Sequence, residues 1–135
     1  DPDFSPGGAF AYGSLDEVLS ESDIISLHCP AQAGNVPLID SKAIASMKKG
    51  VTIVNTARGS LLDEAAVLAA LDSGHVAGVT LDAFESEPPE DWTLAKDPRV
   101  VSSPHVGGFT NESVDRAMCA SVDNLLAALS ERGRA

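Results

Sequence analysis

Short apolar runs that alternate with stretches of helical periodicity constrain the fold of this chain most strongly. Turn-forming residues bound four such runs, at residues 23–28, 51–55, 76–81 and 100–102. Apolar positions spaced as on one face of a helix fall between and beside these runs, at residues 15–20, 41–48, 62–73 and 111–132. This alternation is typical of a parallel β-sheet whose strands are joined by crossover helices. We therefore expect an α/β fold with a doubly wound parallel sheet.

The composition of these segments indicates how they pack. The runs "VTIV" and "VAGVTL" are apolar without alternation, which is typical of strands buried on both faces. The third helix opens with Asp63 and Glu64 and stops at Gly74, as a helix dipole and a glycine cap require. The last helix has a single apolar stripe, formed by Val114, Ala117, Met118, Val122, Leu125, Leu126 and Leu129.

Composition also limits the partners. A net charge of -11 with nine Lys and Arg and no basic run argues against nucleic acid or an anionic membrane surface. Residues 1–20 lack the pattern of a signal peptide, and no apolar run approaches the roughly 18 residues of a membrane helix. Cys29 and Cys119 are too few for a disulfide framework, and neither lies in a cluster typical of zinc sites. We expect a cytoplasmic protein that binds a small molecule and no metal.

Chemically active residues follow every expected strand, in "HCP", "NTARG", "DAFESEP" and "SPHVGG". Open α/β sheets bind ligands beyond the carboxyl ends of their strands, so we expect one site there. Arg58 in this position needs an acidic partner or an anionic ligand; taken alone, a structural ion pair is the simpler interpretation. Glu87 precedes two prolines, and His105 lies between a proline and a glycine pair. Such rigid flanks suit side chains that must be aimed, and imidazole suits acid–base work near neutrality.

The run from "SDIISLHCP" through "NTARG" and "LDAFESEPP" to "VVSSPHVGG" strongly resembles the D-isomer-specific 2-hydroxyacid dehydrogenases. The resemblance covers almost the whole chain, and the motifs occur in the family's order. It implies a Rossmann-type NAD-binding domain and hydride transfer between NAD(H) and a D-2-hydroxy acid or 2-keto acid. It also implies a homodimer in the complete protein.

The resemblance assigns three catalytic roles. Arg58 would bind the substrate carboxylate and polarise the 2-keto oxygen, Glu87 would hydrogen-bond the catalytic histidine, and His105 would exchange a proton with the 2-hydroxyl. Asp82 would contact the nicotinamide end of the cofactor. The whole cofactor-binding set implied by the family comprises Asp1, Cys29, Pro30, Thr56, Ala57, Arg58, Asp82, His105, Gly107 and Gly108.

One motif of the family has no counterpart in the 135 residues: the glycine-rich G-x-G-x-x-G turn. The opening "DPDFSP" resembles the segment after the family's second strand, which would make Asp1 the acid that binds the adenosine ribose. An acid there favours NAD over NADP; a frayed terminus is the alternative. We expect residues 1–135 to form part of the NAD-binding domain, incomplete at the N-terminus, with the substrate domain outside the chain and no turnover by this part alone.

Strand order sharpens this expectation. The fold orders its strands 3-2-1-4-5-6, so a chain lacking strands 1 and 2 should leave a gap of two strands between residues 23–28 and 51–55. The three later strands should form one contiguous parallel set, with Arg58, Glu87 and His105 beyond their ends. Two other functions stay open: a non-catalytic NAD-sensing module, as in corepressors of this family, and an inactive fragment. The substrate is open too, since its selectivity residues are expected in the absent domain.

Overall fold

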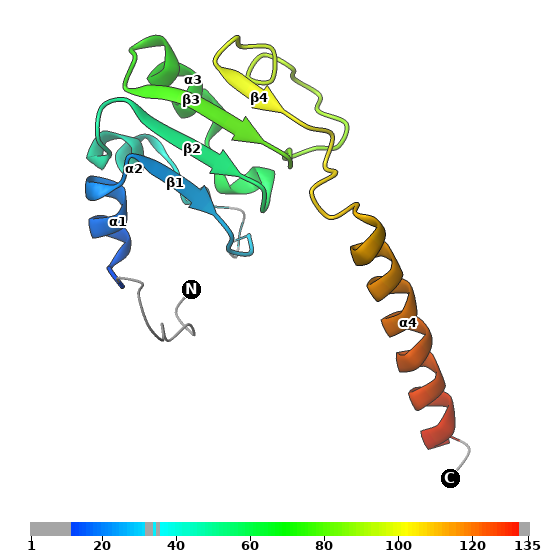
Figure 1. Cartoon of the computed structure of the whole chain (residues 1–135). Helices are drawn as coiled ribbons and strands as arrows, with labels where there is room; N and C mark the ends of the chain where they lie inside the picture. The colour runs from blue at the N-terminus through cyan, green and yellow to red at the C-terminus, as the bar shows by residue number, and fades with distance from the viewer. Residues whose placement is uncertain (1–11, 32–33, 35, 133–135) are drawn as a thin grey trace. The chain divides into compact units, whose positions relative to one another are not determined.

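The computed structural model describes residues 12–31, 34 and 36–132. Four parallel strands form its one described sheet, in the order β1-β2-β3-β4 (Figure 1). These strands are β1 (Ile24–Leu27), β2 (Val51–Asn55), β3 (Val76–Leu81) and β4 (Val100–Ser102). The helices are α1 (Leu15–Glu21), α2 (Ser41–Ser46), the short 3-10 helix η2 (Gly59–Leu61), α3 (Glu64–Asp72) and α4 (Asn111–Arg132). The predicted parallel α/β fold is confirmed.

The chain divides into two compact units. Asp1–His105 contains the sheet with α1, α2 and α3, and Val106–Ala135 contains α4. Helix α4 spans the 22 residues that the apolar stripe predicts. Over the residues that the structure describes, no helix combines the length and the apolar character needed to cross a membrane.

The prediction of a two-strand gap between the first two strands is wrong. β1 pairs directly with β2 in parallel, with Ile24 opposite Thr52 and Leu27 opposite Asn55. The expectation treated residues 23–28 as the third strand of the 3-2-1-4-5-6 order. In that order, strands 4, 5 and 6 are neighbours in sequence and in space, and the observed sheet follows this consecutive pattern. Strand order therefore gives no argument for a break inside this chain.

The later strands pair as expected. β2 pairs with β3 and β3 pairs with β4, all in parallel, so the carboxyl ends of the strands meet at one edge of the sheet. Arg99 holds the short strand β4 against α3, since it donates to the Leu71 carbonyl and to the carboxylates of Asp72 and Asp97. Hydrogen bonds from Arg99 lower the pKa of Asp97 to about 2. This clamp fixes the strand that leads to His105.

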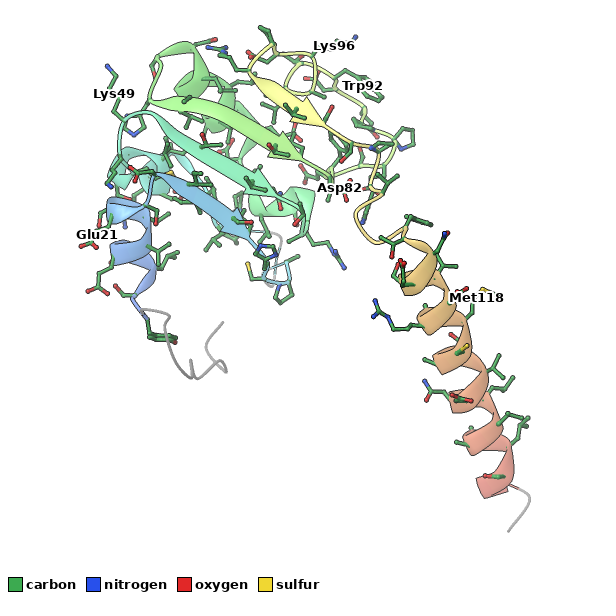
Figure 2. The ribbon with its side chains drawn as sticks, in the orientation of Figure 1. Glu21, Lys49, Asp82, Trp92, Lys96 and Met118 are labelled. Carbon is green, nitrogen blue, oxygen red and sulfur yellow. The ribbon has the colours of Figure 1, made fainter. Side chains whose placement is uncertain are left out.

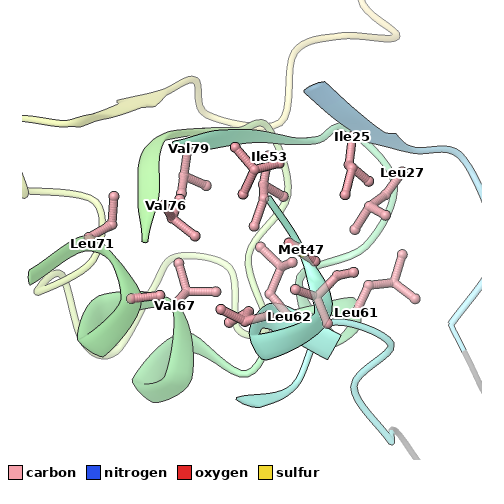
Figure 3. Close-up of a cluster of buried hydrophobic side chains, with 14 of the residues drawn as sticks. Ile25, Leu27, Met47, Ile53, Leu61, Leu62, Val67, Leu71, Val76 and Val79 are labelled. Atoms are coloured by element: carbon pink, nitrogen blue, oxygen red, sulfur yellow. The ribbon is translucent and has the colours of Figure 1, made fainter. Parts of the chain in front are cut away.

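The core lies on one face of the sheet. In β1 the exposed residues Ile24 and Ser26 alternate with the buried residues Ile25 and Leu27. β2 alternates in the same way between buried and half-buried positions. In Figure 3, Ile25, Ile53 and Val79 point from the sheet toward the helices. The expected burial of both faces is therefore wrong for the described residues. A short apolar run cannot by itself distinguish one buried face from two.

Polar side chains set where the helices begin and end. Ser14 and Glu17 form a reciprocal capping box at the start of α1, in which each side chain accepts from the other's backbone N–H. Asp63 caps α3 by accepting from the Ala66 N–H at 3.0 Å, so the helix begins one residue later than its acidic pair suggests. Gly74, with φ 68°, ends the same helix, as predicted.

Candidate active site at the carboxyl edge of the sheet

Glu87 and His105 meet beyond the ends of β3 and β4. Nδ1 of His105 lies 2.8 Å from both carboxylate oxygens of Glu87, and Oε1 of Glu87 also accepts from the Phe84 N–H at 3.1 Å. The hydrogen bonds from His105 and then from Phe84 hold the pKa of Glu87 below its usual value of 4.5. Because an ionised carboxylate only accepts, Nδ1 carries the shared proton. With the proton on Nδ1, Nε2 of a neutral imidazole is the ring nitrogen that accepts hydrogen bonds.

The backbone aims His105. Ser103 extends the ladder past β4 by donating its N–H to the Leu81 carbonyl at 2.9 Å, and the His105 N–H then turns back to the Ser103 carbonyl at 3.0 Å. His105 itself has φ 54°, in the left-handed region that residues other than glycine rarely adopt. Such conformations cost on the order of 1–3 kcal/mol and concentrate at functional sites. This observation favours a functional role for the histidine over a packing role.

A buried asparagine shapes the loop that presents Arg58. Asn55 is fully buried at the end of β2; its Nδ2 donates to the Arg58 carbonyl at 2.8 Å, and its Oδ1 accepts from the Ala57 N–H at 3.1 Å. The Arg58 side chain is exposed and donates to the Ala57 carbonyl. Among the described residues, no carboxylate lies within ion-pair distance of Arg58. The structural ion pair considered from the sequence is therefore not found there, and the guanidinium has charge to offer an anion.

Gly59 lets two functional loops touch. A Cβ atom at Gly59 would lie 2.0 Å from the Phe84 carbonyl carbon and 2.1 Å from the Glu85 nitrogen. The loop that carries Arg58 therefore packs backbone against backbone on the loop that carries Glu87, at a distance only glycine permits. The sequence motif "NTARG" contains this glycine but gave it no role. Its position directly after a charged loop residue is the signal that could have found it.

Asp82 and Ser103 join the ends of β3 and β4. Asp82 is only 5% exposed, and its Oδ1 accepts from the Ser103 hydroxyl at 2.5 Å. Its negative charge raises the pKa of Glu87, although the lowering by His105 is larger. Figure 2 labels Asp82 at the end of β3 and Trp92 on the segment that leads to β4. Ser103 escaped the sequence prediction because its partner is distant in sequence.

The remaining predicted cofactor residues fall at different places. Cys29 and Ala57, after β1 and β2, are half-buried against the core, while Pro30 and Thr56 beside them are exposed. Gly107 and Gly108 are exposed and belong to the second unit. Asp1 lies outside the described residues. Over the described part of the chain, no group of three or more His, Cys, Asp or Glu residues could hold a metal ion.

Comparisons with known proteins place this chain in a family. Residues 4–107 match the model of the D-isomer specific 2-hydroxyacid dehydrogenase, NAD binding domain. D-3-phosphoglycerate dehydrogenase of Bacillus subtilis is 47% identical over 74% of this chain and 19% of its own length. 4-Methyl-2-oxopentanoate reductase A of Aspergillus oryzae is 41% identical over 94% of this chain and 38% of its own length.

Solved structures of similar enzymes superpose on this chain. A glyoxylate reductase from Paecilomyes thermophila superposes with a TM-score of 0.81 and 44% identity, over 87% of this chain and 36% of that chain. D-Lactate dehydrogenase from Aquifex aeolicus, complexed with NAD and lactic acid, superposes with a TM-score of 0.82 and 34% identity, over 90% of this chain and 41% of that chain.

This chain spans well under half the length of the proteins it matches, between 19% and 41% in these four comparisons. The matches confirm the predicted Rossmann-type fold and NAD as the cofactor of the domain. The chain belongs to the D-isomer-specific 2-hydroxyacid dehydrogenase family, in which it corresponds to the NAD-binding domain.

Proposed function

We propose that this chain is part of the NAD-binding domain of an oxidoreductase that interconverts a D-2-hydroxy acid and its 2-keto acid. The bidentate contact of His105 Nδ1 with Glu87 at 2.8 Å carries the proposal. It supplies an oriented imidazole at the edge where α/β sheets bind their ligands. Family membership supports NAD-linked oxidoreduction as the class of reaction.

The chain's own residues would divide the work. Glu87 holds the Nδ1 proton of His105, so that Nε2 can give a proton to a keto oxygen or take one from a 2-hydroxyl. Arg58 binds the substrate carboxylate, since its exposed guanidinium has no carboxylate partner among the described residues. Bound NAD supplies the hydride acceptor for the hydroxy acid, and NADH the donor for the keto acid.

The carboxyl edge fits one end of a dinucleotide. In this proposal Asp82, which follows β3 at the same edge of the sheet, contacts the nicotinamide end of the cofactor. Other cofactor contacts in this proposal are Cys29, Pro30, Thr56, Ala57, Arg58, Gly107 and Gly108. The substrate domain would lie elsewhere in the protein, and a homodimer in the cytoplasm stays a prediction.

Replacement of His105 tests the proposal. In the protein that carries this domain, His105→Gln should lower NADH-dependent reduction of 2-keto acids by about a hundredfold to ten-thousandfold, because positioned proton transfer contributes that much. NADH affinity, measured by NADH fluorescence, should fall far less than turnover. His75→Gln is the matched control, since Nε2 of His75 lies 3.1 Å from the Met47 carbonyl oxygen and the residue takes no part in the proposed site. Near-normal turnover in His105→Gln contradicts the acid–base assignment.

Measurements of NADH binding and of turnover in the parent protein also distinguish this function from its alternatives. NADH binding without turnover on any of a panel of 2-keto acids would favour a non-catalytic NAD-sensing module. Absence of NADH binding by the 135-residue chain, together with binding by a longer protein that contains it, would favour an inactive part.

A further inference from the structure

A cavity of about 360 Å³ opens beside the Glu87–His105 pair. Its size falls in the usual range for small-molecule sites. Glu87 and His105 form its charged end, and its other walls are mostly apolar. The apolar walls are Phe84, Pro88, Pro89, Trp92 and Pro104. An apolar hollow with a few polar groups at one end is the ordinary form of a ligand site.

The walls are held in place from several directions. The rings of Phe84 and Trp92 lie with centroids 6.5 Å apart at 45°. Behind Trp92, Asp91 accepts hydrogen bonds from the Thr93 N–H and hydroxyl, and Leu94 is buried in the core at 3% exposure. The wall that carries Trp92 is therefore anchored to the core through Leu94.

The charges around the cavity select among ligands. No Lys or Arg lines it, and the one carboxylate there, Glu87, has a pKa below its usual value and is ionised at neutral pH. A phosphate or a second carboxylate placed inside would meet this negative charge, because the one basic group on the lining, His105, is already bonded to Glu87. An apolar side chain would instead remove aromatic and proline surface from water, at roughly 25 cal/mol per Å².

We propose that this cavity receives the apolar side chain of a 2-keto acid, of the size of a branched aliphatic group, with Trp92 as a specificity-determining residue. This inference rests on the proposed function, because it places the keto oxygen at His105. The inference assigns one residue that determines substrate selectivity to this chain. From the sequence, all such residues are expected in the substrate domain.

Trp92 gives a direct readout, because it is the single tryptophan of the chain. Its fluorescence is to be followed while the chain is titrated with 4-methyl-2-oxopentanoate and, separately, with 2-oxoglutarate. The branched acid should give a saturating change at a concentration at least about tenfold lower than the dicarboxylic acid, a ratio typical of discrimination in an apolar pocket. No change with the branched acid, or equal responses to both acids, overturns the proposal.

A pair of neighbouring variants ties the response to the cavity. Ser102 is exposed on β4 and lines the cavity, while Val101 beside it is 69% exposed and does not. Ser102→Leu should fill the hollow and weaken binding of 4-methyl-2-oxopentanoate at least about tenfold. Val101→Leu should leave binding as in the parent, and equal weakening by both variants counts against the cavity.

The same pair distinguishes this inference from the proposed function. In the protein that carries this domain, Ser102→Leu should lower kcat/KM for 4-methyl-2-oxopentanoate at least about tenfold more than kcat/KM for pyruvate. Val101→Leu, outside the cavity, should leave both as in the parent. A loss of both in His105→Gln, with no selectivity change in Ser102→Leu, retains the function and rejects the pocket. A Trp92 response with no turnover in the parent protein rejects the function and retains the pocket.

Discussion

Glu87 owes its lowered pKa to two donors, and the larger effect comes from His105. His105→Ala removes that donor, so the midpoint of the Glu87 carboxyl should rise toward 4.5. Carbon-detected NMR titration of the chain measures this midpoint. Glu17 is an internal control, because its pKa is lowered by Ser14 instead and should not move. An unmoved Glu87 midpoint would show that the pair does not form in solution.

The same pair makes stability depend on pH. The pKa of Glu87 is lower in the folded chain than its usual value of 4.5. The contribution of this carboxylate to the free energy of unfolding is therefore fully present above pH 4.5. That contribution is lost as the pH falls through the lowered pKa. The difference in unfolding free energy between the parent chain and His105→Ala should therefore shrink below pH 4.5, as measured by urea denaturation. A difference that stays constant through this window contradicts the ion pair.

Arg58 should not tolerate lysine. A point charge cannot reproduce the two-pronged contact of a guanidinium with a carboxylate. In the protein that carries this domain, Arg58→Lys should lower kcat/KM for 2-keto acids by about tenfold or more, since one charge-assisted hydrogen bond contributes roughly 1.5–3 kcal/mol. The unfolding free energy should change by no more than about 0.5 kcal/mol, as for other surface positions. Unchanged kcat/KM would remove Arg58 from the site.

Residues that act through local chemistry were predictable, and residues that act through tertiary contact were not. Glu87 and His105 stand out because prolines and glycines flank them within a few positions. Asn55, Gly59 and Ser103 do not stand out, because each is explained by the path of a loop or by a partner on another strand. A single sequence shows neither the path of these loops nor which residues meet across strands.

At the scale of elements, local pattern predicted strand bounds but not all of their pairing. The bounds of β2, β3 and β4 agree with the prediction residue for residue, since turn-forming or polar residues bound each apolar run. The pairing of β1 with β2 was predicted wrongly, because the order of strands is a long-range property. Short runs also failed to indicate that the described sheet buries only one face.

The contact between the Arg58 loop and the Glu87 loop can be tested by replacing Gly59 with alanine, which adds one methyl group. Gly59→Ala places a Cβ within 2.1 Å of two backbone atoms of Phe84 and Glu85, so backbone must move. Urea denaturation should show a loss of about 1–3 kcal/mol or more, the usual cost of overpacking. Gly108→Ala is the control, since no atom lies within 4 Å of its added Cβ. Equal stability of the two variants would contradict the close packing of these loops.

On the scale of the whole molecule, the parallel sheet explains why residues far apart in sequence share a site. Parallel pairing brings the carboxyl ends of β2, β3 and β4 to one edge. Asn55 ends β2 there, and Asp82 and Ser103 directly follow β3 and β4. A second consequence concerns the sheet face that points away from the core of this unit. Ile24 is 67% exposed and Val101 69% exposed at the two outer strands, where a soluble domain normally keeps polar side chains.

The apolar side chains at the outer strands predict self-association of the isolated chain. β1 has a strand partner on one side only among the described residues, and unpaired edges with apolar neighbours favour pairing between molecules. Sedimentation velocity of the chain should show an average mass that rises with concentration. Ile24→Lys should shift the chain toward monomer, because a lysine at an edge strand opposes such pairing. Val36→Lys, at a loop position that is 57% exposed, adds the same charge away from the sheet and should leave the association unchanged. A parent chain that stays monomeric at every concentration, or an equal effect of both lysines, would show that the sheet does not drive association.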